Sequence, residues 1–227
     1  MIISYFAESQ KAGDSYNELQ RLVNDRELTE EETGPIDLQH RITVDFPALK
    51  KINPDVVGWI RLECTDIDYP VVRTDNNDYY LNHLFSGEKN NNGSIFVDYR
   101  NTGDFSDKNT VIYGHHMKNG MMFSPLEKYK NQAFYDANPT ITLLTPNGDY
   151  YIELICGTVE DGNTQFIDFY FNNENDFVEY IESLRARSTF VSDVELMPED
   201  RIVSLCTCSY EWSNARFMVI GRVVSAQ

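Results

Sequence analysis

The stretch that decides the fold reads Ile202-Val203-Ser204-Leu205-Cys206-Thr207-Cys208, then a polar loop, then Arg216-Phe217-Met218-Val219-Ile220. Two apolar runs joined by a short loop predict two neighbouring antiparallel strands. Such a pair places Cys208 and Arg216 at adjacent strand ends. Neighbouring strands lie about 4.8 Å apart, so the arginine can reach the thiol and favour its thiolate. Spacing alone is also compatible with a buried structural cysteine and a solvated arginine.

Further short apolar runs lie upstream, separated by turn residues, and together with this pair they predict eight strands. Asn147-Gly148 stands between two of them and is typical of a hairpin turn. Eight short strands at this spacing indicate a mainly β protein with a closed, eight-stranded barrel. A helix capped by Asn175 or Asp176 interrupts them at Phe177–Arg185. The expected strands are Val57–Glu63, Tyr69–Val72, Gly93–Asp98, Thr110–Tyr113, Thr140–Thr145, Tyr150–Val159, Arg201–Cys208 and Arg216–Val224.

The first quarter of the chain has a different, helical pattern. Apolar residues at helical spacing predict a helix that begins at Asp14 or Ser15. The acidic stretch Thr29–Pro35 predicts an exposed linker, and Phe46–Leu49 predicts a short helix with proline near its start. We therefore expect an N-terminal helical appendage and linker over residues 1–45 and a barrel domain over residues 46–227.

The composition excludes several classes of function. Lys and Arg number 19 against 36 Asp and Glu, a formal charge of −17, which would repel phosphate backbones and makes a nucleic-acid partner improbable. The sequence contains no run of about 18 apolar residues that could span a bilayer. Four cysteines are too few for a disulfide scaffold, and Cys64 and Cys156 are expected to be buried core residues.

A second group of chemically capable residues follows another strand. The run Val111-Ile112-Tyr113 leads into Gly114 and the paired imidazoles of His115 and His116. A Cys–His pair is the minimum for acyl transfer, because the thiolate attacks and the imidazolium protonates the leaving amine. His40 and His83 have no comparable context and are interpreted as structural or surface residues.

These segments resemble the sortase family. Ser204–Cys208 is similar to the family signature Thr-Leu-x-Thr-Cys, with serine in place of the first threonine, and Arg216 follows at the family's spacing. Gly114-His115 matches the family's Gly-His, so the resemblance assigns the catalytic role to His115 and not to His116. Class B of the family is indicated by segments such as Asn53–Ile60, Ile67–Val72, Asp78–Leu81, Gly93–Asp98 and Tyr113–Met117.

The resemblance implies a cysteine transpeptidase with an N-terminal helical segment and a helix between the sixth and seventh barrel strands. Such an enzyme cuts an Asn-Pro-x-Thr-Asn-like or Pro-x-Thr-Gly-like sorting signal, holds the cleaved protein as a thioester on Cys208, and transfers it to a peptidoglycan amine. His115 would be the acid and base and Arg216 the oxyanion donor, with no metal or cofactor. The expected location is the outer face of a Gram-positive cell membrane, through an N-terminal anchor missing from this chain.

Substrate contacts are also implied by the resemblance. The loop 164–171, with Thr164 and Phe166, is expected to form one wall of a peptide groove. Asn77 and Leu81 are expected in the opposite wall, and Cys206 and Thr207 lie next to the nucleophile. Ser209 stands where some relatives carry an acid.

Three alternatives remain open at this point. A hydrolytic cysteine protease would use the same catalytic residues, although no papain-like signature surrounds any cysteine here. A zinc-binding module could use Cys206, Cys208, His115 and His116, although structural zinc sites usually have wider cysteine spacing. The third alternative is a barrel that only binds.

Overall fold

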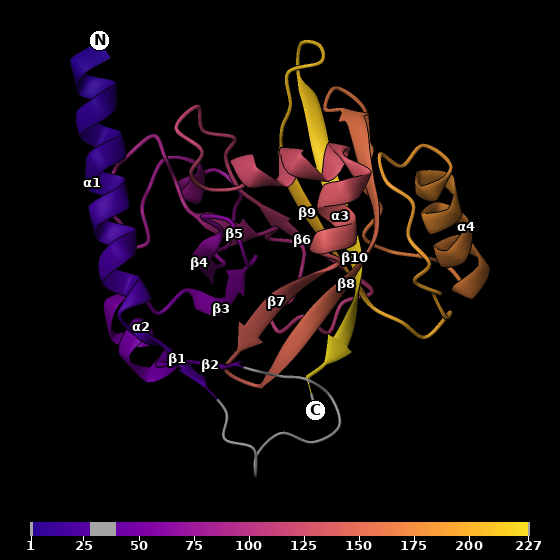
Figure 1. The fold of residues 1–227 in the computed structure, drawn as a ribbon, viewed down its shortest axis with the longest axis horizontal. Helices are drawn as coiled ribbons and strands as arrows, with labels where there is room; N and C mark the ends of the chain where they lie inside the picture. The colour runs from indigo at the N-terminus through magenta and orange to yellow at the C-terminus, as the bar shows by residue number, and fades with distance from the viewer. Residues whose placement is uncertain (1, 28–39, 227) are drawn as a thin grey trace.

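The computed structural model describes residues 2–27 and 40–226, so the predicted linker Thr29–Pro35 lies outside the described residues. Eight strands close into one barrel in the order β10-β8-β7-β3-β4-β5-β6-β9 (Figure 1). The predicted fold class is confirmed, and the predicted strand ends differ from the observed ones by no more than two residues. The barrel strands are β3 (Val56–Arg61), β4 (Asp68–Val72), β5 (Ile95–Val97), β6 (Asn109–Tyr113), β7 (Thr140–Thr145), β8 (Gly148–Asp161), β9 (Ile202–Cys208) and β10 (Ala215–Ser225).

Strand β9 lies between a parallel and an antiparallel neighbour. It pairs in parallel with β6, with Tyr113 opposite Cys206, and antiparallel with β10, with Arg216 opposite Cys208. The ends of β6 and β9 and the start of β10 therefore meet at the same rim of the barrel. The remaining pairings are antiparallel except for β4 with β5.

Alternate side chains of β9 enter two different hydrophobic cores. Val203 and Leu205 belong to the main core inside the barrel. Ile202 and Cys206 belong to a second core, on the outer face, which also contains the buried face of helix α4 (Glu174–Arg185). This division follows from the two-residue period of a strand.

Helix α4 lies between β8 and β9, the sixth and seventh barrel strands, as predicted. It begins earlier than expected, because the side chain of Asn173 caps it by accepting a hydrogen bond from the Asp176 backbone N–H, at 3.1 Å. The prediction of Asn175 or Asp176 as the cap is wrong. Two short helical segments were not predicted, η2 (Ser124–Lys130) and α3 (Gln132–Ala137), and a further single turn, η1, covers Tyr79–Leu81.

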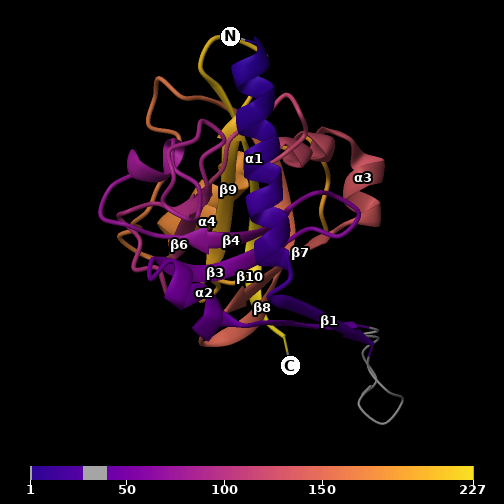
Figure 2. The same cartoon turned by 90° about the vertical axis from the view of Figure 1, so that its left-hand side faces the viewer.

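The N-terminal helix α1 (Ile2–Gln20) runs along one side of the barrel (Figure 2). The predicted start at Asp14 or Ser15 is wrong. Buried side chains continue upstream at helical spacing, so tertiary packing extends the helix beyond the local cap signal. The buried residues of α1 are Ser9, Ala12, Tyr16 and Leu19, and the first two lie upstream of the predicted start.

Two further elements connect α1 to the barrel. Strands β1 (Val23–Glu27) and β2 (His40–Val44) form an antiparallel pair that was not predicted. Helix α2 (Phe46–Ile52) confirms the predicted short helix, and Asp45 caps it by accepting from the Ala48 N–H at 2.9 Å. Within residues 2–27 and 40–226, every helix is too short or too polar to cross a membrane.

Tyr16 joins α1 to the barrel segment that precedes β5. Its buried hydroxyl donates to the carbonyl oxygen of Gly93 at 2.7 Å and lies 3.2 Å from the Ser94 hydroxyl. Burial raises the pKa of this phenol well above its usual range, so it remains a donor. Tyr16, which the predicted boundary after residue 45 assigns to the N-terminal appendage, thus contacts the barrel directly. The boundary itself stays a prediction.

We expect Tyr16→Phe to lower the free energy of unfolding by about 1–2 kcal/mol, since it removes a buried donor and leaves the Gly93 carbonyl unpaired. The measurement is chemical denaturation of the full chain. Tyr151→Phe is the matched control, because the Tyr151 hydroxyl has no hydrogen-bond partner among the described residues. Equal stability of the two variants would show that the Tyr16 hydrogen bond contributes nothing.

Candidate active site

The β9–β10 pairing places Cys208 directly opposite Arg216, and both residues are half-buried. Opposed residues of an antiparallel pair share one face, with Cβ atoms about 4.5–5.5 Å apart. The only side-chain hydrogen bond of Arg216 among the described residues goes to the neighbouring Ala215 carbonyl, at 3.0 Å, and no carboxylate of that set forms an ion pair with it. The site therefore contains a thiol beside an uncompensated guanidinium.

Cys206 lies two residues before Cys208 and hence on the same face of β9. It is only 2% exposed. Burial raises the pKa of the Cys206 thiol to about 12, which the nearby Arg216 opposes only in part, so Cys206 stays protonated. Burial also raises the pKa of Cys156 to about 12, and its predicted core position is confirmed. Cys64, predicted to be buried, is exposed, because it lies in the turn that follows β3 and has a left-handed backbone (φ 60°).

Gly114 carries the chain from β6 to the histidines. Its N–H donates to the Cys206 carbonyl at 3.1 Å, which extends the β6–β9 pairing by one residue. A Cβ at this position would lie 2.5 Å from Ile95 Cδ1 and 2.7 Å from Phe123 Cδ2. The site therefore requires glycine here because of close packing, a requirement that the sequence pattern alone could not explain.

The ring of His115 is held by a backbone carbonyl. Its Nε2 lies 2.7 Å from the Leu81 oxygen, and because a carbonyl can only accept, Nε2 must carry a proton. Nδ1 is then the nitrogen available for proton transfer. No hydrogen bond joins His115 to Cys208 among the described residues.

His116 has a different environment. Its Nδ1 donates to the backbone carbonyl of Cys208 itself, at 2.9 Å. Its ring lies 4.8 Å from the ring of Tyr210, and Nδ1 is 3.8 Å from a carboxylate oxygen of Glu127. The structure thus brings both histidines to the strand end that carries Cys208. His116 is bound to the backbone there, and Nδ1 of His115 has no hydrogen-bond partner among the described residues.

One predicted wall of the groove is anchored by a buried carboxylate. Asn77 Nδ2 donates to Asp98 at 2.9 Å, and Asp98 also accepts from the Tyr113 hydroxyl and the Arg100 guanidinium. Although burial raises it, the hydrogen bonds from Arg100 hold the pKa of Asp98 below its ordinary value. Leu81 is 40% exposed on this wall.

The opposite wall contacts the same arginine. The guanidinium of Arg100 lies 3.7 Å from the ring centroid of Phe169, and the Arg100 carbonyl accepts from the Tyr170 hydroxyl at 3.4 Å. Phe166 packs against the second core, and Thr164 is exposed. Arg100 and Asp98 were not predicted as site residues, because only the folded chain shows that they connect the two walls.

A network of charges lies beside Cys208, around the next residue, Ser209. The hydroxyl of Ser209 donates to Glu127 at 2.6 Å, and Lys130 forms ion pairs with both Glu127 and Glu211. Although burial raises it, the hydrogen bonds from Lys130 and Ser209 lower the pKa of Glu211, so this carboxylate is ionised at neutral pH. The two carboxylates of the network therefore share the ammonium of Lys130.

The comparisons with known proteins agree with this geometry. The Sortase domain family matches residues 60–224 of the chain. This chain belongs to the sortase family. Sortase B of Listeria monocytogenes is 39% identical over 78% of this chain and 73% of its own length. The Staphylococcus aureus sortase B–substrate complex has a TM-score of 0.82 at 30% identity and covers 97% of this chain and 100% of that one. A sortase B complexed with triglycine has a TM-score of 0.75 at 33% identity, covering 80% and 86%.

The predictions of family, class and enzyme type are thereby confirmed. The sortase is a cysteine transpeptidase of the cell-wall sorting type. The predicted catalytic residues Cys208, His115 and Arg216 gather at one rim. Cys206 and Thr207 are both buried, and Thr207 faces away from Cys208. The substrate contacts predicted for these two residues and for the wall residues Asn77, Leu81, Thr164 and Phe166 stay predictions.

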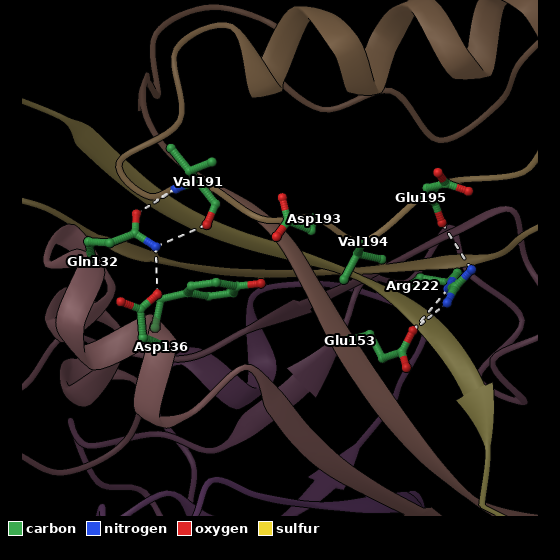
Figure 3. Close-up of a pocket in the computed structure, with 9 residues that line it drawn as sticks. Gln132, Asp136, Glu153, Val191, Asp193, Val194, Glu195 and Arg222 are labelled. Atoms are coloured by element: carbon green, nitrogen blue, oxygen red, sulfur yellow. Dashed lines mark hydrogen bonds and ion pairs between the residues drawn. The ribbon is translucent and has the colours of Figure 1, made fainter.

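A cavity of about 480 Å³ lies elsewhere on the sortase, between α3, β8, β10 and the segment that precedes β9 (Figure 3). Arg222 binds Glu153 there and donates to the Glu195 carbonyl, while Gln132 bonds the backbone of Val191. None of its lining residues belongs to the rim that carries Cys208 and Arg216.

Within residues 2–27 and 40–226, no group of three His, Cys, Asp or Glu residues is placed to hold a metal ion.

We expect a neutral alkylating reagent at neutral pH to modify Cys208 and Cys64 and to leave Cys156 and Cys206 unmodified. The first two are accessible, while the latter two are buried thiols whose pKa values are raised to about 12. Peptide mapping by mass spectrometry gives the answer, with unfolded protein as the control in which all four react. Early modification of Cys206 would contradict the burial described here.

Proposed function

We propose that Cys208 attacks the scissile carbonyl of a C-terminal sorting signal and holds the secreted protein as a thioester until a cell-wall amine displaces it. The observation that carries this proposal is the opposition of Cys208 to the uncompensated guanidinium of Arg216. A thioester preserves acyl-transfer potential, so the exchange needs neither ATP nor a metal.

The first half-reaction uses three groups. The Cys208 sulfur forms a bond to the carbonyl carbon, and Arg216 donates hydrogen bonds to the oxyanion that develops. Protonated Nδ1 of His115 then gives its proton to the leaving amine as the peptide bond breaks. The Leu81 carbonyl keeps the Nε2–H of His115 in place, so Nδ1 is the atom that exchanges the proton.

The second half-reaction reverses these roles. The acceptor amine attacks the thioester carbon, Nδ1 of His115 removes a proton from that amine, and Cys208 leaves as the thiolate. Water can compete with the amine, so hydrolysis is the alternative outcome of the same intermediate. Support for an amine acceptor comes from the relative that was solved with triglycine.

The peptide is proposed to lie between the two walls that Arg100 connects. Asn77 and Leu81 would contact it on one side, and Thr164 and Phe166 on the other. Cys206 and Thr207 would act beneath the scissile bond. The signal is expected to be Asn-Pro-x-Thr-Asn-like or Pro-x-Thr-Gly-like, and the acceptor to be a peptidoglycan amine. The proposed location is the outer face of a Gram-positive cell membrane, with an N-terminal anchor.

We expect incubation with peptides of the two signal types to produce a covalent adduct on Cys208 whose mass equals the N-terminal peptide fragment. Intact-protein mass spectrometry detects the adduct and identifies the preferred signal. Cys208→Ala should give no adduct and no cleavage while keeping the fold. An added amine should convert the hydrolysed product into a transpeptidation product.

Three results would overturn parts of this proposal. Turnover by Cys208→Ala would remove Cys208 as the nucleophile. Product that never incorporates the amine would favour a hydrolytic protease. Absence of adduct and cleavage with both peptide types would contradict the proposed substrate class.

Arg216→Lys is expected to lower kcat/KM by about 100-fold or more, because an ammonium cannot reproduce the planar, multiply donating guanidinium. Steady-state kinetics with the preferred peptide measures the loss. Arg222→Lys is a suitable control, since Arg222 pairs with Glu153 in the cavity away from the catalytic rim. Arg216→Lys with activity near that of the wild type would exclude the oxyanion role.

A further inference from the structure

A third side chain lies in line with Cys208 and Arg216. The β8–β10 pairing places Glu160 directly opposite Arg216, on the side away from Cys208. Directly opposed residues share a face and have Cβ atoms about 4.5–5.5 Å apart. Cys208, Arg216 and Glu160 therefore form one row across β9, β10 and β8, with the guanidinium between a thiol and a carboxylate.

Glu160 is nevertheless bound to a different cation. Its Oε1 accepts from Nε of Arg187 at 3.0 Å, and Nη1 of Arg187 donates to the Ser183 carbonyl at 2.7 Å. The Glu160 side chain is 11% exposed, whereas that of Arg187 is 47% exposed. Arg187 follows the last turn of α4, so a segment outside the barrel supplies the partner of a carboxylate in the barrel wall.

The alternative pairing would inactivate the proposed oxyanion donor. A buried carboxylate without a partner is costly. The residue directly opposite Glu160 on β10 is the cation Arg216. An ion pair between Glu160 and Arg216 would draw the guanidinium toward β8, away from Cys208. It would also neutralise the one positive charge that lies opposite Cys208 among the described residues.

We propose that Arg187 is a positioning residue, which keeps Arg216 available to the reaction by holding Glu160. This inference rests on the proposed oxyanion role of Arg216. The arrangement parallels the one on the other side of the nucleophile, where Lys130 holds Glu127 and Glu211. Glu127, Glu211 and Glu160 are thus bound to other cations. Among the described residues, Arg216 has no carboxylate as an ion-pair partner.

The test is a set of three variants measured for kcat/KM with a sorting-signal peptide. Arg187→Met keeps the length of the side chain and removes its charge, and it should lower kcat/KM by about tenfold or more. Glu160→Gln should remain close to the wild type, because the amide cannot compete for Arg216. The double variant should recover activity to within about threefold of the wild type, since the competing carboxylate is gone.

A second readout is independent of any sorting signal. The rate at which iodoacetamide alkylates Cys208 at neutral pH should fall in Arg187→Met and return in the double variant, because a cation beside a cysteine promotes its reaction and Arg216 lies opposite Cys208. If no peptide is cleaved by the wild type, the substrate proposal fails, while the alkylation rates still decide the role of Arg187.

The control variant is Arg185→Met, which removes another arginine from the end of α4, one that pairs with the exposed Glu182. It should leave the alkylation rate unchanged, and thermal unfolding of all variants reports any loss of structure. A purely structural role for Arg187 predicts no recovery in the double variant, which still lacks the ion pair. That result, or an Arg187→Met enzyme with wild-type rates in both assays, would overturn the proposal.

Discussion

The hydrogen-bond ladders on the two sides of β9 determine the position of every catalytic candidate. The parallel ladder with β6 brings Gly114 and the two histidines to the end of β9, and the antiparallel ladder with β10 brings Arg216 opposite Cys208. A shift of either register by one residue would turn the side chains to the other face. The buried residues of the main core, such as Val203 and Leu205, prevent that shift, so core packing and catalytic geometry are linked.

The arrangement of charges around Cys208 leaves Arg216 without a carboxylate partner among the described residues. The chain has a formal charge of −17, and three carboxylates lie close to the proposed catalytic pair, Cys208 and Arg216. Glu127 and Glu211 bind Lys130, and Glu160 binds Arg187. An acidic protein can therefore maintain a positively charged acyl-transfer site, because the neutralising contacts are local and partly buried, where screening by solvent is weak.

The sequence predicted those parts of the site that depend on short segments. Cys208 and Arg216 flank one loop, and Gly114 precedes His115, so apolar runs and turn residues were sufficient to place them. The roles of Asp98, Arg100, Glu160 and His116 depend on contacts between distant segments and could not be predicted. The predicted start of α1 was wrong because tertiary packing extends the helix beyond the local cap signal. The predicted cap of α4 was wrong because several neighbouring residues can cap a helix, and the structure uses Asn173.

The parallel pairing of β6 with β9 also has a kinetic consequence. His116 and Cys208, which this pairing brings into contact, are separated by 92 positions. Contacts between such distant segments form slowly, because the loss of chain entropy comes before the stabilising interactions. We expect closure by β9 to be a late step in folding, after the β7–β8 hairpin has formed. A partly folded chain would then contain a cysteine without Arg216 and the histidines beside it, and its acyl-transfer chemistry would begin only when the barrel is complete.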